Sequence, residues 1–308
     1  MKLRKSFVAG IFTLLATLVF CMATTFAAAN FETGSITATG YGVANPNLAR
    51  NPGHARILAR RAALVDAQRN LLEEVQGVSV TAETTVENLM LANDVVKTRV
   101  TGVINGYQVV SEQYNSDGTF EVTIAVSMFG GSAPLAGAVL EPVQQEAFPE
   151  PTSVNVSVNV GVNQPVTQQP TVQQPTVQQP VQQPSSAAPV PASASGTRAS
   201  GNYTGLVVDC SGLGLKPVMS PVIKNDSGQP IYGYKNLNYS KVIANGMAGY
   251  ASSMSNTQRA GANPLVVKAV SLDNHNGNPV ISTADANRVL VENQASHFLD
   301  NCAVVFVR

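Results

Sequence analysis

The chain has 308 residues, and its 19 lysine and arginine side chains balance 19 aspartate and glutamate side chains. A neutral chain lacks the basic surface of a nucleic-acid-binding protein. Three cysteines are too few for a disulfide-framed miniprotein or a cysteine-rich zinc module. Hydrophobic residues make up 44% of the chain, which is enough for a buried core. No group of residues in the sequence has the pattern of a catalytic site, so we expect no enzyme activity and no cofactor.

The first 29 residues have the pattern of an export signal. Three cations within the first five residues precede an apolar run over residues 7–20, and residues 27–29 are three alanines. Small residues after an apolar run are typical of a cleavage site. We therefore expect a signal peptide over residues 1–29 and a mature chain with three more acidic than basic residues.

Two other interpretations of this segment are a retained membrane helix and a lipid anchor. The apolar run approaches the roughly 20 residues that span a bilayer, although four threonines dilute it and the alanines close it. Lipid attachment would use Cys21. A lipoprotein signal needs a small residue before its cysteine, and Phe20 is bulky, so lipidation is the less favoured reading.

A first α+β domain is expected over residues 30–130. Asn51 and Pro52 are typical of a helix start and Gly77 of a helix stop. Asp117-Gly118 predicts a hairpin turn. The expected elements are a strand at 35–39, a helix at 53–76 with the apolar stripe Ile57, Leu64, Ala67, Leu71, Leu72 and Val75, a strand at 78–86, a short helical turn at 87–93, a β-rich stretch at 95–114, and a strand at 119–128 with Phe120, Val122, Ile124 and Val126 on one face. This order favours an antiparallel sheet with one helix packed across it.

This domain resembles a known family through three features. They are the alanine-rich helix with a central Asp66 over residues 59–72, the Gly-Val-Ser-Val sequence at 77–80, and the hairpin at 109–126. They are similar to the bacterial membrane-associated surface lipoprotein family and to the N-terminal domain of the flagellar ring protein FlgT. The resemblance implies an exported envelope protein, in some members lipidated or linked to flagella or the outer membrane, without catalytic residues.

A low-complexity linker is expected over residues 131–200. Its centre repeats Val-Gln-Gln-Pro, and such frequent proline prevents helix and sheet pairing. We interpret it as an extended, disordered spacer that could let the two domains reach different layers of the envelope. Upstream of the repeats, alternating valines at 154–162 indicate a strand.

A second α+β domain is expected over residues 201–308, and parts of it resemble uncharacterised exported bacterial proteins. The expected elements are strands at 203–208, 216–224 and 229–235, a helix at 239–254, a strand at 265–272, a helix at 282–295 capped by Ser282 or Thr283, and a strand at 303–307. The sequence Asn-Asp-Ser-Gly at 225–228 predicts a hairpin turn.

Cys210 and Cys302 are the cysteines left after signal cleavage. In an oxidising envelope two such cysteines suggest a disulfide, which would close a loop of about 90 residues. The alternatives are two buried free thiols or a redox pair, although a redox motif places its cysteines two residues apart.

No metal site is expected. His54, His275 and His297 share no metal-ligand spacing. Residues 273–278 resemble half of a calcium loop but lack the acidic residue at the loop's end, so we expect a plain turn.

These observations favour a non-enzymatic protein of the periplasm or outer membrane that binds envelope or flagellar proteins. The alternative is a periplasmic module that binds a glycan or peptidoglycan. A hydrolase is the third and weakest hypothesis, because no residues in the sequence support it.

Overall fold

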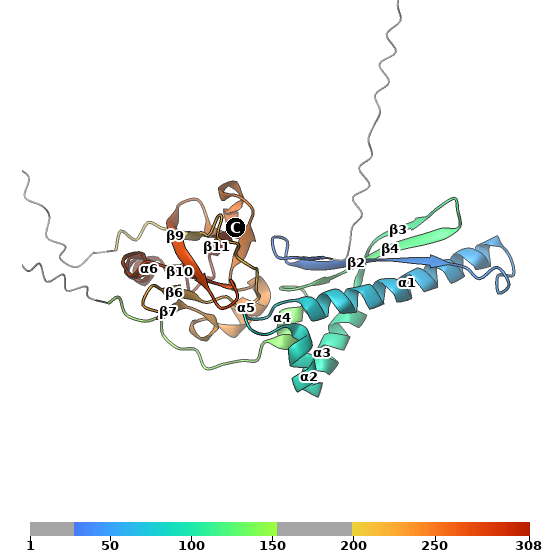
Figure 1. The fold of residues 1–308 in the computed structure, drawn as a ribbon, viewed down its shortest axis with the longest axis horizontal. Helices are drawn as coiled ribbons and strands as arrows, with labels where there is room; N and C mark the ends of the chain where they lie inside the picture. Colours follow the sequence, from blue (N-terminus) through green and yellow to red (C-terminus); the bar gives the residue numbers. More distant parts are fainter. Residues whose placement is uncertain (1–27, 153–198) are drawn as a thin grey trace, which may run out of the picture.

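The computed structural model describes residues 28–152 and 199–308, which form two α+β domains (Figure 1). The expected fold class is therefore confirmed. In the first domain, helix α1 crosses one face of an antiparallel sheet with strand order β1-β2-β4-β3. Its elements are β1 Ala28–Asn30, β2 Ser35–Val43, α1 Pro52–Gly77, α2 Val86–Ala92, α3 Asp94–Asn105, β3 Gln108–Tyr114, β4 Thr119–Ser127 and α4 Leu135–Val139.

The second domain is built on a seven-stranded sheet with strand order β7-β6-β10-β9-β5-β11-β8. Its centre is parallel, because β5 pairs in parallel with both β9 and β11. The elements are β5 Gly205–Asp209, β6 Ile223–Asn225, β7 Pro230–Tyr232, the 3-10 turn η1 Tyr234–Asn236, α5 Tyr239–Asn245, β8 Gly249–Ala251, the 3-10 turns η2 Met254–Asn256 and η3 Gln258–Ala260, β9 Pro264–Asp273, β10 Asn278–Ile281, α6 Thr283–Ser296 and β11 Val304–Val307.

Helix α1 begins as its sequence predicts but buries a different face. The Asn51 side chain accepts a hydrogen bond from the His54 backbone N–H at 2.8 Å, and Pro52 is the first helical residue. Ile57, expected in the apolar stripe, is 53% exposed. The buried face instead consists of Ala59, Ala63, Ala67, Leu71 and Val75.

Two glycines of β2 explain this alanine face. A Cβ atom on Gly40 would lie 2.1 Å from the backbone nitrogen of Ala67, and one on Gly42 would lie 2.2 Å from the carbonyl oxygen of Ala59. The helix and strand backbones therefore approach each other so closely that only glycine and alanine fit between them. Larger side chains are displaced to the flanks of the helix.

The predicted hairpin is confirmed. The prediction of a β-rich stretch at 95–114 is wrong for its first half, which is helix α3, and right for its second half, which is strand β3. Residues of α3 form a helix, because Val96, Val100, Val103 and Ile104 recur at helical spacing and are buried together. The side chain of Asn93 caps this helix by accepting from the backbone N–H groups of its first turn. The expected strand at 78–86 is a loop with a single bridge between Ser79 and Thr85.

In the second domain the helix expected at 239–254 ends at Asn245. Gly246 follows with a φ of +73°, a conformation that favours glycine, and the chain then enters β8. Helix α6 is confirmed within one residue of its prediction, and the Ser282 hydroxyl caps it by accepting from the Asp285 N–H at 3.1 Å.

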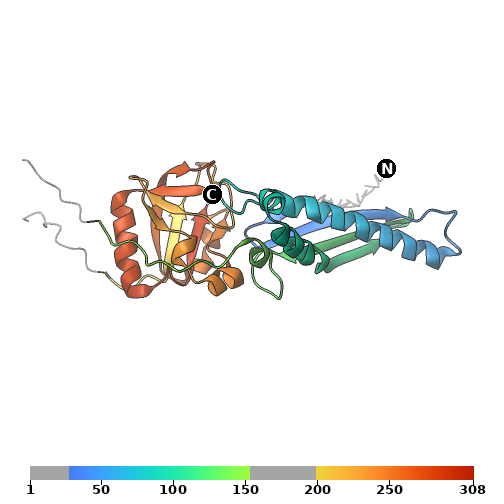
Figure 2. The same ribbon diagram turned by 90° about the horizontal axis from the view of Figure 1, so that it is seen from below.

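The two domains pack directly against each other (Figure 2). The backbone N–H groups of Met219 and Ser220 donate to the carbonyl groups of Ser79 and Val80 at 2.9 and 2.8 Å. Buried apolar residues of both domains belong to one continuous core. This contact does not support the expectation that the domains are held apart to reach different layers.

The segment between the domains is ordered at both of its ends. Residues 131–152, expected to begin the linker, contain α4 and a stretch that crosses the second domain. Residues 153–198, with the strand expected at 154–162, lie outside the described residues. The last described residue before the gap, Thr152, bonds Asn287, and Ser200, the second described residue after the gap, bonds Glu292. Both partners lie on α6, about 7.5 Å apart along its axis.

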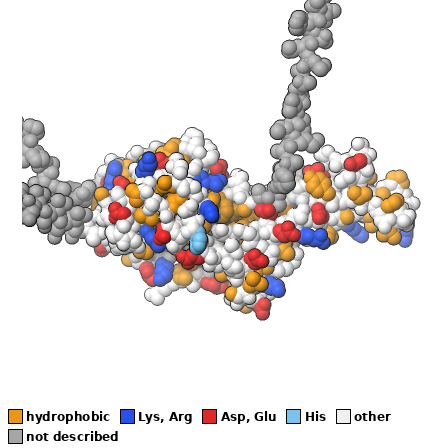
Figure 3. All heavy atoms as spheres, in the orientation of Figure 1, with side chains coloured by type: hydrophobic (Ala, Val, Ile, Leu, Met, Phe, Trp, Pro, Cys, Tyr) orange, Lys and Arg blue, Asp and Glu red, His pale blue; other side chains and the backbone are white. Residues whose placement is uncertain are grey.

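None of the helices within the described residues is long and apolar enough to cross a membrane. Basic and acidic side chains are interspersed over both domains on the face shown in Figure 3.

Candidate binding groove at the domain junction

Residues 140–152, which we call the strap, cross the second domain in an extended conformation. The Glu146 N–H donates to the Lys235 carbonyl at 2.7 Å, and the Asn236 side chain donates to the Ala147 carbonyl at 3.1 Å. In both bonds the strap contributes a backbone atom, so its path does not depend on the identity of its side chains at these positions.

Aromatic residues also hold the strap. Phe148 stacks on the buried Tyr232 with ring centroids 6.3 Å apart and ring planes 8° apart. The Tyr234 hydroxyl donates to the Glu141 carbonyl at 2.7 Å. The strap is thereby part of the fold of the second domain, although it follows the first domain in sequence.

A cavity of about 760 Å³, which we call the strap groove, lies between three parts of the chain. The loop at 81–83 comes from the first domain and residues 143–149 from the strap. The second domain supplies the hairpin of β6 and β7 together with Asn274 and Asn278 of the β9–β10 hairpin. Its volume is within the range of about 300–1,000 Å³ typical of small-molecule sites. Each of the three parts contributes to its walls, so the groove exists only while both domains and the strap are in place.

Amide side chains supply the polar chemistry of the strap groove. Asn278 is 4% exposed, and its Oδ1 atom accepts from the Val222 N–H at 3.0 Å. Its amide nitrogen has no protein partner among the residues that the structure describes. The Gln229 Oε1 atom accepts from Asn225 at 3.4 Å, and its amide nitrogen is likewise left as a donor. The groove therefore presents hydrogen-bond donors that belong to uncharged amide side chains.

The charges at the groove largely compensate one another. Lys235 and Glu146 form an exposed ion pair at 3.6 Å, and Glu83 is the third charged residue of the lining. Apolar walls are supplied by Val143, Val222 and two prolines. The arrangement suits a neutral ligand rich in oxygen atoms better than an ion.

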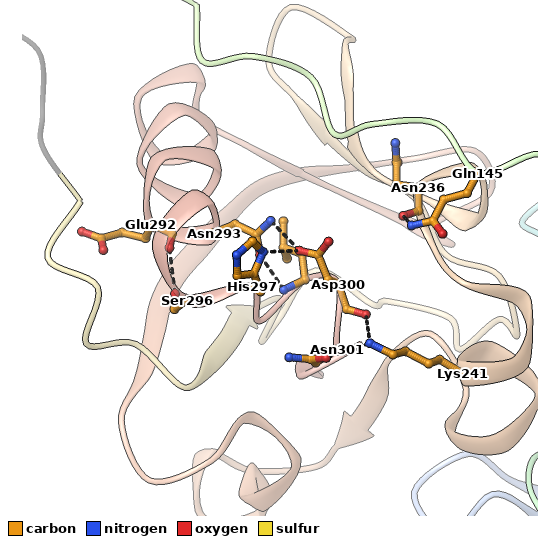
Figure 4. Close-up of polar contacts among 10 residues, drawn as sticks. Gln145, Asn236, Lys241, Glu292, Asn293, Ser296, His297, Asp300 and Asn301 are labelled. Carbon is orange, nitrogen blue, oxygen red and sulfur yellow. Dashed lines mark hydrogen bonds and ion pairs between the residues drawn. The ribbon is translucent and has the colours of Figure 1, made fainter.

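A smaller hollow of about 310 Å³ lies against the strap and the end of α6. The Asn293 side chain donates to Asp300 Oδ2 at 3.0 Å (Figure 4) and accepts from the Leu299 N–H at 2.8 Å. His297 caps α6 in a left-handed conformation, and its Nδ1 lies 3.6 Å from Asp300 Oδ2. These groups bond one another to terminate the helix, so we interpret the cluster as structural.

The other two histidines also have structural surroundings. His54 Nδ1 accepts from the Arg50 N–H at 3.2 Å, before the first turn of α1. His275 lies in the turn between β9 and β10, with a φ of +53°, where the sequence predicts a turn. Within residues 28–152 and 199–308, no group of three or more His, Cys, Asp or Glu residues could hold a metal ion.

Cys210 and Cys302 are both buried as free thiols, so the structure does not show the expected disulfide and has the alternative of two buried thiols. Cys210 follows the end of β5, whereas Cys302 precedes the start of β11. Because these strands are parallel neighbours, the cysteines lie at opposite ends of the pair. About six residues of strand separate them by on the order of 20 Å, whereas a disulfide requires Cα atoms within about 7 Å. Cys21, the candidate lipidation residue, lies outside the described residues.

We expect two thiols per mature protein in a thiol titration carried out without reductant in denaturant. Burial raises the pKa of the Cys210 thiol to about 12 and also raises the pKa of Cys302. The native protein should therefore react with less than one thiol equivalent at pH 8 over the same time. A denatured, unreduced protein with no reactive thiol would contradict this arrangement.

Each domain is similar to a different known family. Residues 35–127 match the LPP20 lipoprotein family, and residues 205–308 match the second domain of Treponema pallidum Tp0624. No curated protein matches the chain. Fold and matches together define a two-domain protein similar to surface lipoproteins. The LPP20 match supports an exported protein of the bacterial envelope.

Proposed function

We propose that this protein is a non-enzymatic binding protein of the bacterial envelope and that the strap groove holds a neutral glycan such as the N-acetylglucosamine part of peptidoglycan. The observation that carries the proposal is the buried Asn278, whose amide nitrogen lacks a protein partner beside a cavity of about 760 Å³. Among the described residues no fully buried side-chain nitrogen or oxygen atom lacks a partner, so this amide nitrogen is accessible and can donate to a ligand in the groove. Sugar hydroxyl and acetamido oxygens are suitable acceptors.

The balance of charge at the groove supports a glycan over a charged ligand. Lys235 and Glu146 pair with each other, while amides and apolar walls make up most of the lining. Sugars present both hydroxyl groups and apolar C–H faces, which match such a lining. Binding rather than catalysis is supported because general acid–base chemistry needs positioned titratable groups, whereas Glu146 is paired with Lys235 and Glu83 is the one other carboxylate of the lining.

Location and partners extend this proposal. We propose export by the signal peptide at 1–29, with periplasmic or outer-membrane association, and the LPP20 match supports this placement. Association with flagellar proteins rests on the sequence resemblance. Fractionation and N-terminal sequencing of the mature protein test the first part, and the motility of a deletion strain tests the second.

We expect soluble, uncharged glycan fragments made of N-acetylglucosamine to bind the mature protein and the Asn278→Asp variant to bind them at least tenfold more weakly. Aspartate keeps the acceptor that bonds the Val222 N–H but removes the donor, and discrimination by buried hydrogen bonds reaches this size. Isothermal titration calorimetry measures both affinities.

The exposed Asn47, in a first-domain loop far from the groove lining, provides the matched control. Asn47→Asp adds the same charge and should leave the affinity unchanged. If fragments bind the Asn278→Asp variant as tightly as the original protein, the groove is not their site. If no fragment binds the original protein, the glycan proposal fails.

A further inference from the structure

A second cavity at the domain junction contains a cation without an anionic partner. It has a volume of about 440 Å³ and shares no lining residue with the strap groove. Phe31 and Phe129 of the first domain line it together with Tyr250 and Arg259 of the second. We call it the Arg259 pocket.

Backbone carbonyl groups hold Arg259 in place. Its Nε atom donates to the Cys302 carbonyl at 2.9 Å, and its Nη1 and Nη2 atoms donate to the Asn245 and Gly246 carbonyls, each at 2.6 Å. A guanidinium group has five N–H donors, so two remain after these three bonds. Rotation of the side chain is restricted on three sides, which fixes where the remaining donors lie.

No carboxylate of the described residues pairs with Arg259, although two of its carbonyl acceptors lie at the negative C-terminal end of α5 and partly compensate its charge. None of the ion pairs within the described residues includes it. Burial lowers the pKa of this guanidinium, but arginine remains protonated in proteins. A partly buried, permanent cation with two free donors is a preformed site for an anion, and a planar carboxylate matches the fork of two N–H groups.

The walls beside Arg259 are aromatic. Phe31 packs edge-on against Tyr250 with ring centroids 5.6 Å apart. The Tyr250 hydroxyl is occupied, since it donates to the Val218 carbonyl at 2.9 Å and accepts from the Val218 N–H at 3.0 Å. Tyr250 therefore offers the pocket only its ring.

We propose that the Arg259 pocket binds a small organic carboxylate with an apolar body. The carboxylate accepts from the two free N–H donors of Arg259, and the apolar body lies against Phe31 and Phe129. Because both domains contribute to the pocket, the ligand also stabilises their contact. Glu32 lines the same pocket, and its exposed carboxylate opposes anion binding from the first-domain side.

The test uses benzoate as the probe and benzamide as its neutral counterpart of the same shape. We expect benzoate, at constant ionic strength, to shift the Nε–H resonance of Arg259 in the spectrum of the ¹⁵N-labelled mature protein and to raise its Tm. Benzamide should do neither. Equal responses to the two probes, or an unmoved Arg259 resonance, would overturn the proposal.

Glu32→Gln provides a variant that does not touch the anchors of Arg259. Removing one exposed negative charge within a Debye length should tighten benzoate binding about two- to fourfold. Arg259→Lys should abolish benzoate binding. If that variant does not fold, the benzoate affinity of Glu32→Gln and the Arg259 resonance of the original protein still test the proposed site. Unchanged or weaker benzoate binding by Glu32→Gln would contradict the site.

Discussion

Replacing Gly40 by alanine is expected to lower the free energy of unfolding by about 3 kcal/mol, the upper range for overpacking a core. The added methyl group would lie 2.1 Å from the backbone nitrogen of Ala67 and 2.4 Å from the carbonyl oxygen of Ala63. Both atoms belong to the backbone of α1, so no side-chain rotation can relieve the contact. The helix must move away from the sheet, and the buried alanine face loses its packing.

Urea denaturation of the mature protein measures this loss, and Gly102→Ala is the matched control. Gly102 lies within α3, and a Cβ atom there would have no neighbour within 4 Å. Alanine is favoured over glycine inside a helix by about 0.5–1 kcal/mol, so this variant should be more stable than the original. If both substitutions shift the denaturation midpoint in the same direction, the close approach of α1 and β2 is not what Gly40 provides.

Local chemistry in the sequence was sufficient to predict several elements. Asn51, Pro52 and Gly77 delimit α1 because capping and backbone restriction act within a few residues. The hairpin at Asp117-Gly118 and the buried face of β4 follow from turn chemistry and strict alternation. The interpretation of α3 failed because its β-branched valines suggested a strand, although their spacing of four and three residues and the cap at Asn93 were readable.

Features set by tertiary contacts could not be predicted in this way. The face that α1 buries depends on glycines in another element, and the separation of Cys210 from Cys302 depends on the parallel pairing of β5 with β11. The strap contains the same Pro-Val-Gln-Gln sequence, at residues 142–145, as the repeats that follow it, so composition placed both in one linker. Only the apolar residues of α4 could have indicated that the expected linker begins with an ordered segment. Asn278 of the strap groove carried no signal, because a single asparagine in a β-hairpin is common.

These contacts change the mechanical role of the Pro/Gln-rich region. Its two ends attach to the same helix, at Asn287 and Glu292, while the strap makes the connection between the domains. The length of residues 153–198 therefore does not determine how far the described domains lie from each other. Both junction cavities depend on the fixed arrangement of the domains, which supports a single binding unit.

The attachment at Glu292 gives the second prediction of large effect. We expect Glu292→Gln to lower the free energy of unfolding at pH 7 by about 2 kcal/mol, the range for hydrogen bonds to a charged group. Glu292 is 5% exposed, and its carboxylate accepts from the Ser200 N–H at 2.9 Å, the Ser200 hydroxyl at 3.0 Å and the Gly201 N–H at 3.1 Å. Glutamine would direct an N–H₂ group toward these donors. Glu150→Gln, a change at an exposed strap residue near the same helix, should alter the stability by less than about 0.5 kcal/mol.

The pH dependence identifies the charge as the cause. Burial works to raise the pKa of Glu292, but the donors from Ser200 and Gly201 outweigh it and hold the pKa below its ordinary value. A lowered carboxyl pKa stabilises the fold above the unfolded-state pKa of about 4.3 and ceases to do so as the pH falls through the folded-state value. The stability difference between the original protein and Glu292→Gln should therefore be constant from pH 7 to about pH 5 and diminish below about pH 4. Urea denaturation across this range measures it, and a difference that persists undiminished at pH 3 would mean that the shape of the side chain, not its charge, anchors the returning chain.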